Sequence, residues 1–207
     1  MDTGIDNPEG KRFVSRGGLK MNHALDAFGV DVTGLACVDL GCSTGGFTDC
    51  LLQRGAKSVL SIDTGYGVID YKLRVDDRVT VRERTNALHV EPVSAKELAD
   101  LVVIDLGWTP QSRAIPAALR WLKPSEGAMI ITLIKPHYEK SAKEHSRSGE
   151  GGLIDHDEAE AIATATLDEM AALGVTAHGF EKSPIVGSKS ARKGKGNAEW
   201  LALLRRT

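Results

Sequence analysis

Short apolar runs alternate with helix-like segments along most of the chain, and this alternation restricts the fold more than any other feature. Runs typical of buried strands lie at residues 36–40, 58–63, 79–83, 101–105 and 128–134. Helical spacing or helix-end signals mark residues 16–28, 45–53, 110–122 and 155–173. Strands that alternate with helices in this way predict an α/β fold, a mostly parallel sheet with helices on both faces.

The C-terminal part of the chain has a different pattern. Residues 175–182 and 200–204 are typical of two strands, and the glycine-rich, basic segment between them contains no helical pattern. We expect a terminal hairpin that adds one antiparallel strand, which gives a sheet of seven strands. We also expect a flexible tail over residues 1–12, followed by one domain over residues 13–207.

Composition narrows the class of protein. The 207 residues are 42% hydrophobic and 26% charged, which is typical of a chain that buries a core and folds by itself. The formal net charge is −2, so any attraction to nucleic acid has to come from a local patch. Neither a targeting segment nor a membrane span is present, and we expect a cytoplasmic protein without a membrane partner. The sequence indicates no oligomeric state.

The three cysteines do not have the spacing of a metal site. Cys37, Cys42 and Cys50 are separated by four and seven residues, whereas zinc-binding pairs usually have two residues between them. We interpret them as buried apolar side chains, and an odd number of thiols is consistent with a reducing compartment. No metal is expected.

A glycine-containing loop with the sequence DLGCSTGG follows the first strand, at residues 39–46. In α/β sheets, ligands bind beyond the carboxyl ends of the strands, where glycines let the backbone approach a ligand without an intervening Cβ. The spacing differs from the G-x-G-x-x-G pattern of dinucleotide-binding loops. It favours a cofactor with an amino-acid end and no pyrophosphate, and the whole outline is that of a class I, Rossmann-like methyltransferase fold.

Polar residues after the neighbouring strands extend this predicted cofactor site. Asp63 ends the second strand, where a carboxylate can accept hydrogen bonds from ribose hydroxyls, and Asn86 follows the third strand, near the expected adenine. The interpretation left open for these residues is capping or an ordinary turn. The predicted cofactor-binding residues are Asp39, Gly41, Ser43, Thr44, Gly45, Gly46, Phe47, Asp63, Asn86 and Asp105.

Charged residues also end two of the most apolar strands. Asp105 and Lys135 follow such runs directly, and charges at these positions are costly unless they are paired or functional. We expect both to face one cleft. Desolvation is expected to bring the pKa of Lys135 toward the range useful for accepting a proton, and a structural salt bridge is the alternative.

Several separate motifs together resemble the TlyA-type members of the FtsJ/RrmJ ribosomal RNA 2′-O-methyltransferases. The matching segments are VSRGGLK at 14–20, DLGCSTGGFTD at 39–49, ERTN at 83–86, IKPHYE at 134–139, SP at 183–184 and GNAEW at 196–200. They cover the chain from about residue 12 to its end. Such a resemblance implies a class I fold, S-adenosylmethionine as cofactor and an RNA partner that is ribosomal.

That family uses a Lys-Asp-Lys-Glu tetrad around the reacting ribose hydroxyl. The matching residues are Lys20, Asp105, Lys135 and Glu199. By resemblance, Lys135 would deprotonate or orient the 2′-hydroxyl, the two carboxylates would hold the lysines, and Lys20 would position the ribose. A ribose hydroxyl is a poor nucleophile at neutral pH, so it has to be held in line with the methyl group while its proton is removed.

Three departures from the family pattern concern the substrate. The chain is expected to lack the N-terminal S4-like RNA-binding domain that such proteins carry, so recognition would depend on the catalytic domain or a partner. Residues 107–109 are Gly-Trp-Thr where the family usually has a serine and an aromatic residue. A basic loop at 188–195 is longer than expected, and residues 140–152 could close over a substrate as a lid.

Basic residues near the tetrad form the predicted RNA-binding patch. A run of positive charges can neutralise phosphates, although such runs are also common on solvated surfaces. The predicted RNA-binding residues are Arg16, Lys182, Lys189, Arg192, Lys193 and Lys195.

Two other functions stay open from the sequence. One is a small-molecule O-methyltransferase on the same fold, which the altered residues 107–109 favour. Another is a non-catalytic RNA-binding or haemolysin-like module, because TlyA-type proteins have been labelled haemolysins.

Overall fold

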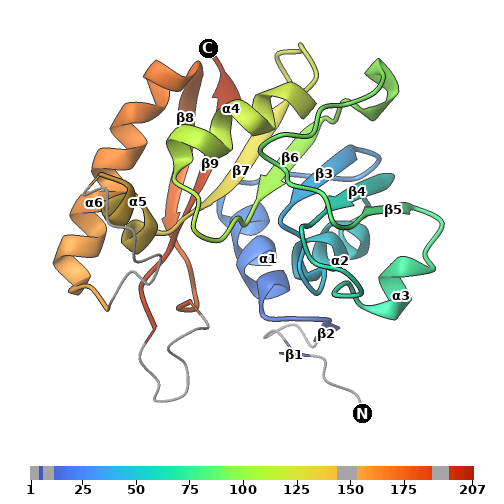
Figure 1. The fold of residues 1–207 in the computed structure, drawn as a ribbon, viewed down its shortest axis with the longest axis horizontal. Coiled ribbons are helices and arrows are strands. Elements are labelled where there is room, and N and C mark those ends of the chain that lie inside the picture. The colour runs from blue at the N-terminus through green and yellow to red at the C-terminus, as the bar shows by residue number, and fades with distance from the viewer. Residues whose placement is uncertain (1–4, 7–11, 144–152, 188–195) are drawn as a thin grey trace.

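A seven-stranded sheet forms the centre of the computed structural model, which describes residues 5–6, 12–143, 153–187 and 196–207 (Figure 1). In order across the sheet, the strands are β5 (Val79–Arg82), β4 (Ser58–Ile62), β3 (Ala36–Leu40), β6 (Leu101–Ile104), β7 (Met129–Ile134), β9 (Trp200–Arg206) and β8 (Val175–Lys182). Strands β5, β4, β3, β6 and β7 pair in parallel, and β9 is antiparallel to both β7 and β8. The expected α/β sheet and its terminal hairpin are therefore confirmed.

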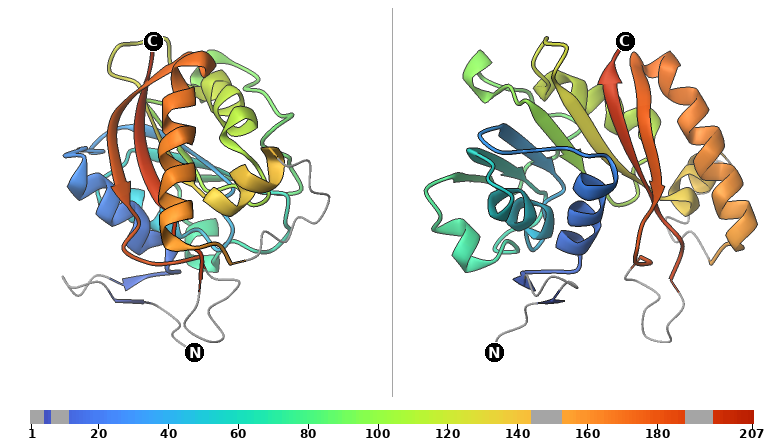
Figure 2. Two further views of the ribbon diagram at one scale, coloured as in Figure 1. Left: turned by 90° about the vertical axis from the view of Figure 1, so that its left-hand side faces the viewer. Right: turned by 180° about the vertical axis from the view of Figure 1, so that it is seen from behind.

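Helices cover both faces of the sheet, as Figure 2 shows from two directions. Helices α1 (Gly17–Ala27) and α2 (Gly46–Gln53) bury apolar side chains such as Met21 and Leu51 against one face. Helices α4 (Gln111–Trp121) and α6 (His156–Asp168) bury Trp121 and Ala163 among others on the opposite face. Each face thus has its own apolar core, and the sheet lies between them.

The register of the central strands decides where polar side chains meet. Leu40 at the end of β3 is opposite Ile104 at the end of β6, and the N–H of Asp105 donates to the carbonyl of Leu40 at 3.0 Å. The N–H of Gly41 donates to the carbonyl of Ile62 at the end of β4, at 2.9 Å. Because these strands are parallel and their ends are aligned, the loops that follow them lie side by side at the carboxyl ends of the strands.

Several predicted boundaries differ from those in the structure. The long helix expected at 155–173 ends at Asp168 and continues as the 3₁₀ helix η2 (Glu169–Leu173). Asp155 caps α6 by accepting from the N–H groups of Asp157 and Glu158. The short helix α3 (Tyr71–Arg74) and the 3₁₀ turn η1 (Ala95–Glu97) were not predicted, since four and three residues are too few for a periodic pattern.

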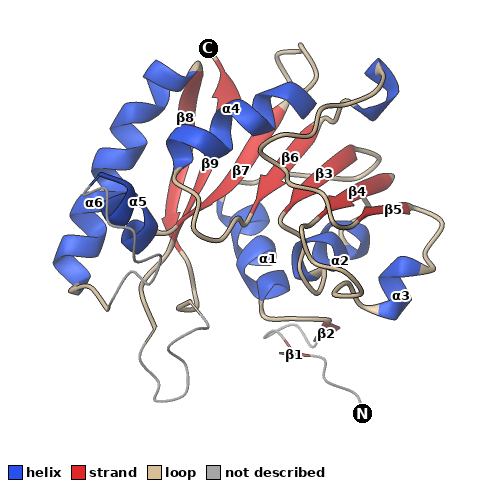
Figure 3. Cartoon of the chain, in the orientation of Figure 1, coloured by secondary structure: helices blue, strands red, loops and turns tan. Residues whose placement is uncertain are grey.

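Part of the segment expected to act as a lid is helical. Residues 140–143 belong to α5 (Pro136–Lys143), and residues 144–152 lie outside the described part of the chain. Proline suits the first position of a helix, because its missing N–H would have no partner there and its φ is already helical. The segment expected to act as a lid therefore begins within a helix at residues 140–143, as Figure 3 shows.

At the N-terminus, residues of the expected tail form one short pairing. Strand β1 (Ile5–Asp6) pairs antiparallel with β2 (Arg12–Phe13), and the other residues before Arg12 lie outside the described part. Phe13 is buried against the glycine of position 18, where an added Cβ would lie 2.3 Å from the Phe13 ring.

Within the residues described, no helix is long and apolar enough to cross a membrane. The three cysteines are buried and free, as expected from their spacing.

Candidate active site

The loop between β3 and α2 has a backbone that only certain residues tolerate. Gly41 and Gly45 have φ values of +90° and +98°, and Ser43 between them has φ of +48°. An added Cβ at Gly41 would lie 2.7 Å from the carbonyl oxygen of Asp105, and one at Gly45 would lie 2.3 Å from Leu73. Left-handed backbone and close packing together explain both glycines.

Gly46 serves the packing of the two N-terminal helices. A Cβ at this position would lie 2.2 Å from the Oγ of Ser15 and 2.8 Å from the backbone nitrogen of Gly18. The glycines were expected to let the backbone approach a ligand. For Gly45 and Gly46 the structure adds a second reason, since an added Cβ at either position would collide with atoms of the protein itself.

Asp39 lies beneath this loop and is completely buried. Its Oδ2 accepts from the backbone N–H of Thr48 at 3.1 Å and from the Thr48 hydroxyl at 2.7 Å. Its Oδ1 has no hydrogen-bond partner among the described residues. Burial raises the pKa of Asp39 to about 7, although the Thr48 hydroxyl lowers it in part. A buried acceptor without a partner is costly, so this oxygen is suited to a ligand group or a water molecule.

Asp63, directly after β4, holds the loop at 39–46 in place through hydrogen bonds. Its Oδ2 accepts from the N–H of Ser43 at 2.8 Å, and its Oδ1 accepts from the N–H of Gly65 at 2.7 Å. Each carboxylate oxygen retains a second lone pair for a ribose hydroxyl. Asn86 is exposed and accepts from the N–H of Leu88 at 2.9 Å, which is the ordinary turn interaction left open from the sequence. Both side chains also line a large cavity.

Two cavities adjoin one another at the carboxyl ends of the parallel strands. The larger has a volume of about 1120 Å³, and its walls include Asp63, Asn86, Lys135 and Glu199. The smaller, of about 410 Å³, lies against residues 14–17 and the loop at 41–47 and includes Asp39 and Phe47 in its wall. Four residues line both cavities. They are Lys20, Gly41, Ser43 and Asp105.

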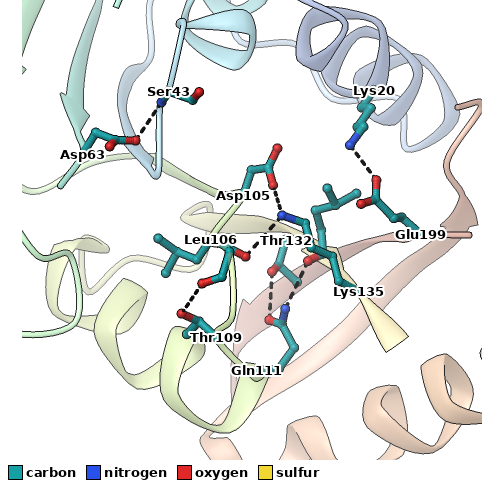
Figure 4. A network of polar contacts seen from close by, with 12 residues as sticks. Lys20, Ser43, Asp63, Asp105, Leu106, Thr109, Gln111, Thr132, Lys135 and Glu199 are labelled. Atoms are coloured by element: carbon teal, nitrogen blue, oxygen red, sulfur yellow. Dashed lines mark hydrogen bonds and ion pairs between the residues drawn. The ribbon is translucent and has the colours of Figure 1, made fainter. Parts of the chain in front are cut away.

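The predicted tetrad comes together where the two cavities join (Figure 4). The ammonium of Lys135, at the end of β7, contacts Oδ1 of Asp105 at the end of β6 and donates to the carbonyl of Leu106 at 3.2 Å. Across the cleft, Nζ of Lys20 on α1 lies 2.5 Å from Oε2 of Glu199, the residue before β9. Two lysine–carboxylate pairs therefore face one another.

Residues 187 and 196–197 pack tightly against one another beside Glu199. An added Cβ at Gly187 would lie 2.9 Å from the Glu199 carboxylate, and one at Gly196 would lie 2.3 Å from the carbonyl of Gly187. The N–H of Gly187 donates to the carbonyl of Asn197 at 3.0 Å, and the Asn197 side chain accepts from the N–H of Ile154 at 3.0 Å. These contacts hold the backbone that carries Glu199.

The charges of the tetrad reinforce one another. Burial alone would raise the pKa of Asp105, but the ammonium groups of Lys135 and Lys20 hold it below its usual value. Burial alone would lower the pKa of Lys135, but the carboxylates of Asp105 and Glu199 hold it above its usual value. The expectation of a lowered lysine pKa is therefore wrong, because two carboxylates outweigh desolvation.

The predicted RNA-binding residues do not form one cluster in the described part of the chain. Arg16 lines the smaller cavity beside the loop at 41–47. Lys182 ends β8, where its ammonium contacts Nε2 of His156 and lies 5.9 Å from the centre of the Trp200 ring. Lys189, Arg192, Lys193 and Lys195 lie outside the described residues.

Aromatic side chains beside Lys135 were not among the predicted site residues. Trp108 is 58% exposed with φ of +50°, and its ring centre lies 6.1 Å from that of Tyr138. The ring centres of His137 and Tyr138 lie 4.1 Å apart with the rings tilted by 49°, and burial together with Lys135 lowers the pKa of His137 to about 4. All three line the larger cavity. The unusual segment at 107–109 marked Trp108, and the motif IKPHYE at 134–139 contains His137 and Tyr138 but gave neither of them a role.

Solved structures with little sequence identity share this fold. An S-adenosylmethionine-dependent methyltransferase from Mesorhizobium loti is 20% identical, with a TM-score of 0.59 over 89% of this chain and 96% of that one. The residues present suit that cofactor, since the smaller cavity holds an unpartnered buried carboxylate oxygen and the larger one holds Asp63 and Asn86. Fold and site together define an S-adenosylmethionine-dependent methyltransferase.

Closer similarity gives the family. Residues 13–205 match the family model described as FtsJ-like methyltransferase, and the chain belongs to this family. The 16S/23S rRNA (cytidine-2′-O)-methyltransferase TlyA of Mycobacterium tuberculosis is 37% identical over 196 residues, which are 94% of this chain and 69% of that protein. Hemolysin A of Brachyspira hyodysenteriae is 35% identical over 92% of this chain and 76% of its own length. A Streptococcus thermophilus structure described as a hemolysin has a TM-score of 0.80 at 35% identity, covering 97% of this chain and 70% of that one.

Proposed function

We propose that this chain transfers a methyl group to the 2′-hydroxyl of a cytidine ribose in ribosomal RNA. The observation that carries the proposal is the pair of lysine–carboxylate contacts, Lys135 with Asp105 and Lys20 with Glu199, facing one another beside the cofactor loop. S-adenosylmethionine, when bound, supplies an electrophilic methyl group on a positively charged sulfonium. The substrate is suggested by the activity named for the M. tuberculosis relative.

The four side chains suit a hydroxyl nucleophile. Proximity to Asp105 and to the carbonyl of Leu106 fixes the Nζ of Lys135 in one position, so a hydroxyl oxygen beside it would be held in a single orientation. Lys20 is fixed by Glu199 in the same way and would hold a second oxygen of the ribose or its phosphate. Orientation is therefore the first contribution of the tetrad.

Proton removal is the second contribution. As the new oxygen–carbon bond forms, the hydroxyl proton has to leave, and Lys135 is the group placed to accept it in its neutral form. Its raised pKa means that this form is a small fraction at neutral pH. Asp105, held ionised by the lysines, would stabilise the ammonium that results.

The larger cavity has room for a substrate beside the cofactor. Its volume of about 1120 Å³ is slightly above the range of roughly 300–1,000 Å³ that is typical of small-molecule sites. Asp63 and Asn86 line the part that follows β4 and β5. Three aromatic residues line the part of the cavity that follows β6 and β7, near Lys135, and they are Trp108, His137 and Tyr138. Aromatic rings at this place are suited to the base of the target nucleotide.

The experiment supplies S-adenosylmethionine with a labelled methyl group to the purified chain, together with total ribosomal RNA or ribosomal subunits. Label should enter the RNA, and the phosphodiester after the labelled nucleotide should resist alkaline hydrolysis because its 2′-oxygen is blocked. Mapping then identifies the nucleotide. Label that enters a base, or that enters small-molecule acceptors but no RNA, would contradict the proposal.

A further inference from the structure

An exposed arginine–tyrosine pair lies outside the tetrad, in the turns that follow β4 and β5. The guanidinium carbon of Arg84 lies 4.1 Å from the centre of the Tyr66 ring, and Tyr66 is 70% exposed. Tyr66 is two residues from Thr64 and Arg84 precedes Thr85, and both threonines line the larger cavity. The pair thus stands beside the rim of that cavity, on the side of Asp63.

Arg84 differs from the other arginines nearby. Arg74, Arg78 and Arg82 form ion pairs with Glu83, Asp76 and Glu97, respectively. Within the described part of the chain, no carboxylate lies within ion-pair distance of Arg84, which is itself exposed. Its positive charge therefore stays available to an anion from solution.

The backbone holds the pair in place at some cost. Arg84 has φ of +51°, a left-handed conformation that is unfavourable for a non-glycine residue. Its N–H donates to the carbonyl of Gly65 at 3.0 Å, and the N–H of Thr85 donates to the carbonyl of Asp63 at 2.9 Å. An exposed cation–π contact contributes little to stability. Stability alone therefore does not account for this arrangement, and strained residues of this kind concentrate at functional sites.

We propose that Tyr66 and Arg84 form a docking point for one unpaired nucleotide of the RNA substrate, next to the nucleotide that is methylated. The free edge of the Arg84 guanidinium would bind a phosphate, and the exposed ring of Tyr66 would stack on a base. Guanidinium groups bind phosphate in a planar, two-pronged way, and base stacking on aromatic rings does not depend strongly on sequence. This inference rests on the proposed function, because it takes RNA as the substrate.

The first test measures the affinity for a fluorescein-labelled single-stranded oligocytidylate of about 12 nucleotides, at several salt concentrations. Tyr66→Ala should weaken binding by roughly tenfold or more, and Tyr66→Phe should bind like the unaltered chain because the ring remains. Arg84→Gln should make the decrease of log affinity with log salt concentration shallower by about 0.7, the value for one phosphate contact on a single strand. Arg84→Lys should retain the slope but lose part of the affinity.

A matched control is Tyr71→Ala, because Tyr71 is 76% exposed on α3 and belongs to no part of the site. It should leave RNA affinity unchanged. Affinity for S-adenosylhomocysteine should be the same in all variants, which excludes an effect through the cofactor. Equal RNA affinity for Tyr66→Ala and the unaltered chain would overturn the inference, as would a change of oligomeric state in this variant.

Methyl transfer separates this inference from the proposed function. If the unaltered chain methylates RNA, Tyr66→Ala should raise the KM for RNA and leave kcat nearly unchanged. An unaltered chain that methylates no RNA would overturn the proposed function. Normal methylation with no effect of Tyr66→Ala on KM would overturn the docking point alone.

Discussion

Lys20 and Glu199 form an ion pair of 2.5 Å although 179 positions separate them in the chain. The side chains are 10% and 3% exposed, so both charges are almost removed from water. The pair joins the first helix to the residue before the last strand and lines the larger cavity. Removing two charges from water is costly, and each group offsets that cost for the other.

Removing one member of this pair should therefore destabilise the chain. Lys20→Ala or Glu199→Ala leaves a buried charge without its partner, which typically costs about 3–5 kcal/mol. The exchanged double variant Lys20→Glu/Glu199→Lys should regain much of that loss but not the activity, since the charges then occupy each other's places. Urea unfolding of Lys20→Glu, of Glu199→Lys and of the exchanged double variant gives the coupling energy. Additive losses in the double variant would show that the contact contributes nothing.

Lys135 should be essential to methyl transfer but not to cofactor binding. Lys135→Ala removes the group placed to accept the proton, and we expect at least a 100-fold loss of rate, as is typical for a general base. Lys135→Arg is the matched variant, because it keeps the positive charge while its guanidinium does not release a proton. Both should bind S-adenosylhomocysteine like the unaltered chain in calorimetry. Substantial activity in Lys135→Arg would contradict the role as base and leave only an orienting role.

The rate of methyl transfer should rise with pH above neutrality. Lys135 has a pKa above its usual value, so its neutral form increases about tenfold for each pH unit until that pKa is reached. Single-turnover rates at saturating substrate, measured between about pH 7 and 9, report this step. A rate independent of pH over this range would show that proton removal by Lys135 does not limit the reaction.

Glu139 gives a prediction about stability that does not involve the reaction. Its Oε1 accepts from the N–H of Gln111 at 2.9 Å, and burial raises its pKa to about 7. The folded chain therefore binds this proton more tightly than the unfolded chain, and stability decreases as pH rises from the usual glutamate pKa toward 7. Glu139→Gln retains the acceptor and removes the charge, so it should stabilise the chain by about 1–3 kcal/mol at pH 8.

The gain from Glu139→Gln should be smaller at pH 5, where the glutamate of the folded chain is already protonated. Glu169→Gln is a suitable control, because this carboxylate is 57% exposed in its pair with Lys143. It should change stability little at either pH. An equal gain from Glu139→Gln at both values would contradict the raised pKa.

Most of the sheet could be predicted because its strands are short apolar runs between turn residues. Strand β3 has the predicted bounds, and β4, β5, β6 and β7 differ from prediction by one residue at one end. Helix α5 was missed because Pro136 follows a strand directly and its first turn contains few apolar residues. The packing contact of Gly46 with Ser15 and Gly18 was also not predicted, since it joins residues that no local pattern relates.

The sequence by itself determined the alternation of strands and helices, the loop at 39–46 and the identity of the four tetrad residues. Those features depend on local patterns and on motif resemblance, and both are readable along the chain. Tertiary structure decided the direction of the Lys135 pKa, because this depends on the distance of Nζ from Asp105 and on the nearby charge of Glu199. It also decided that Tyr66 and Arg84 stack, since their contact depends on β4 and β5 lying side by side in the sheet.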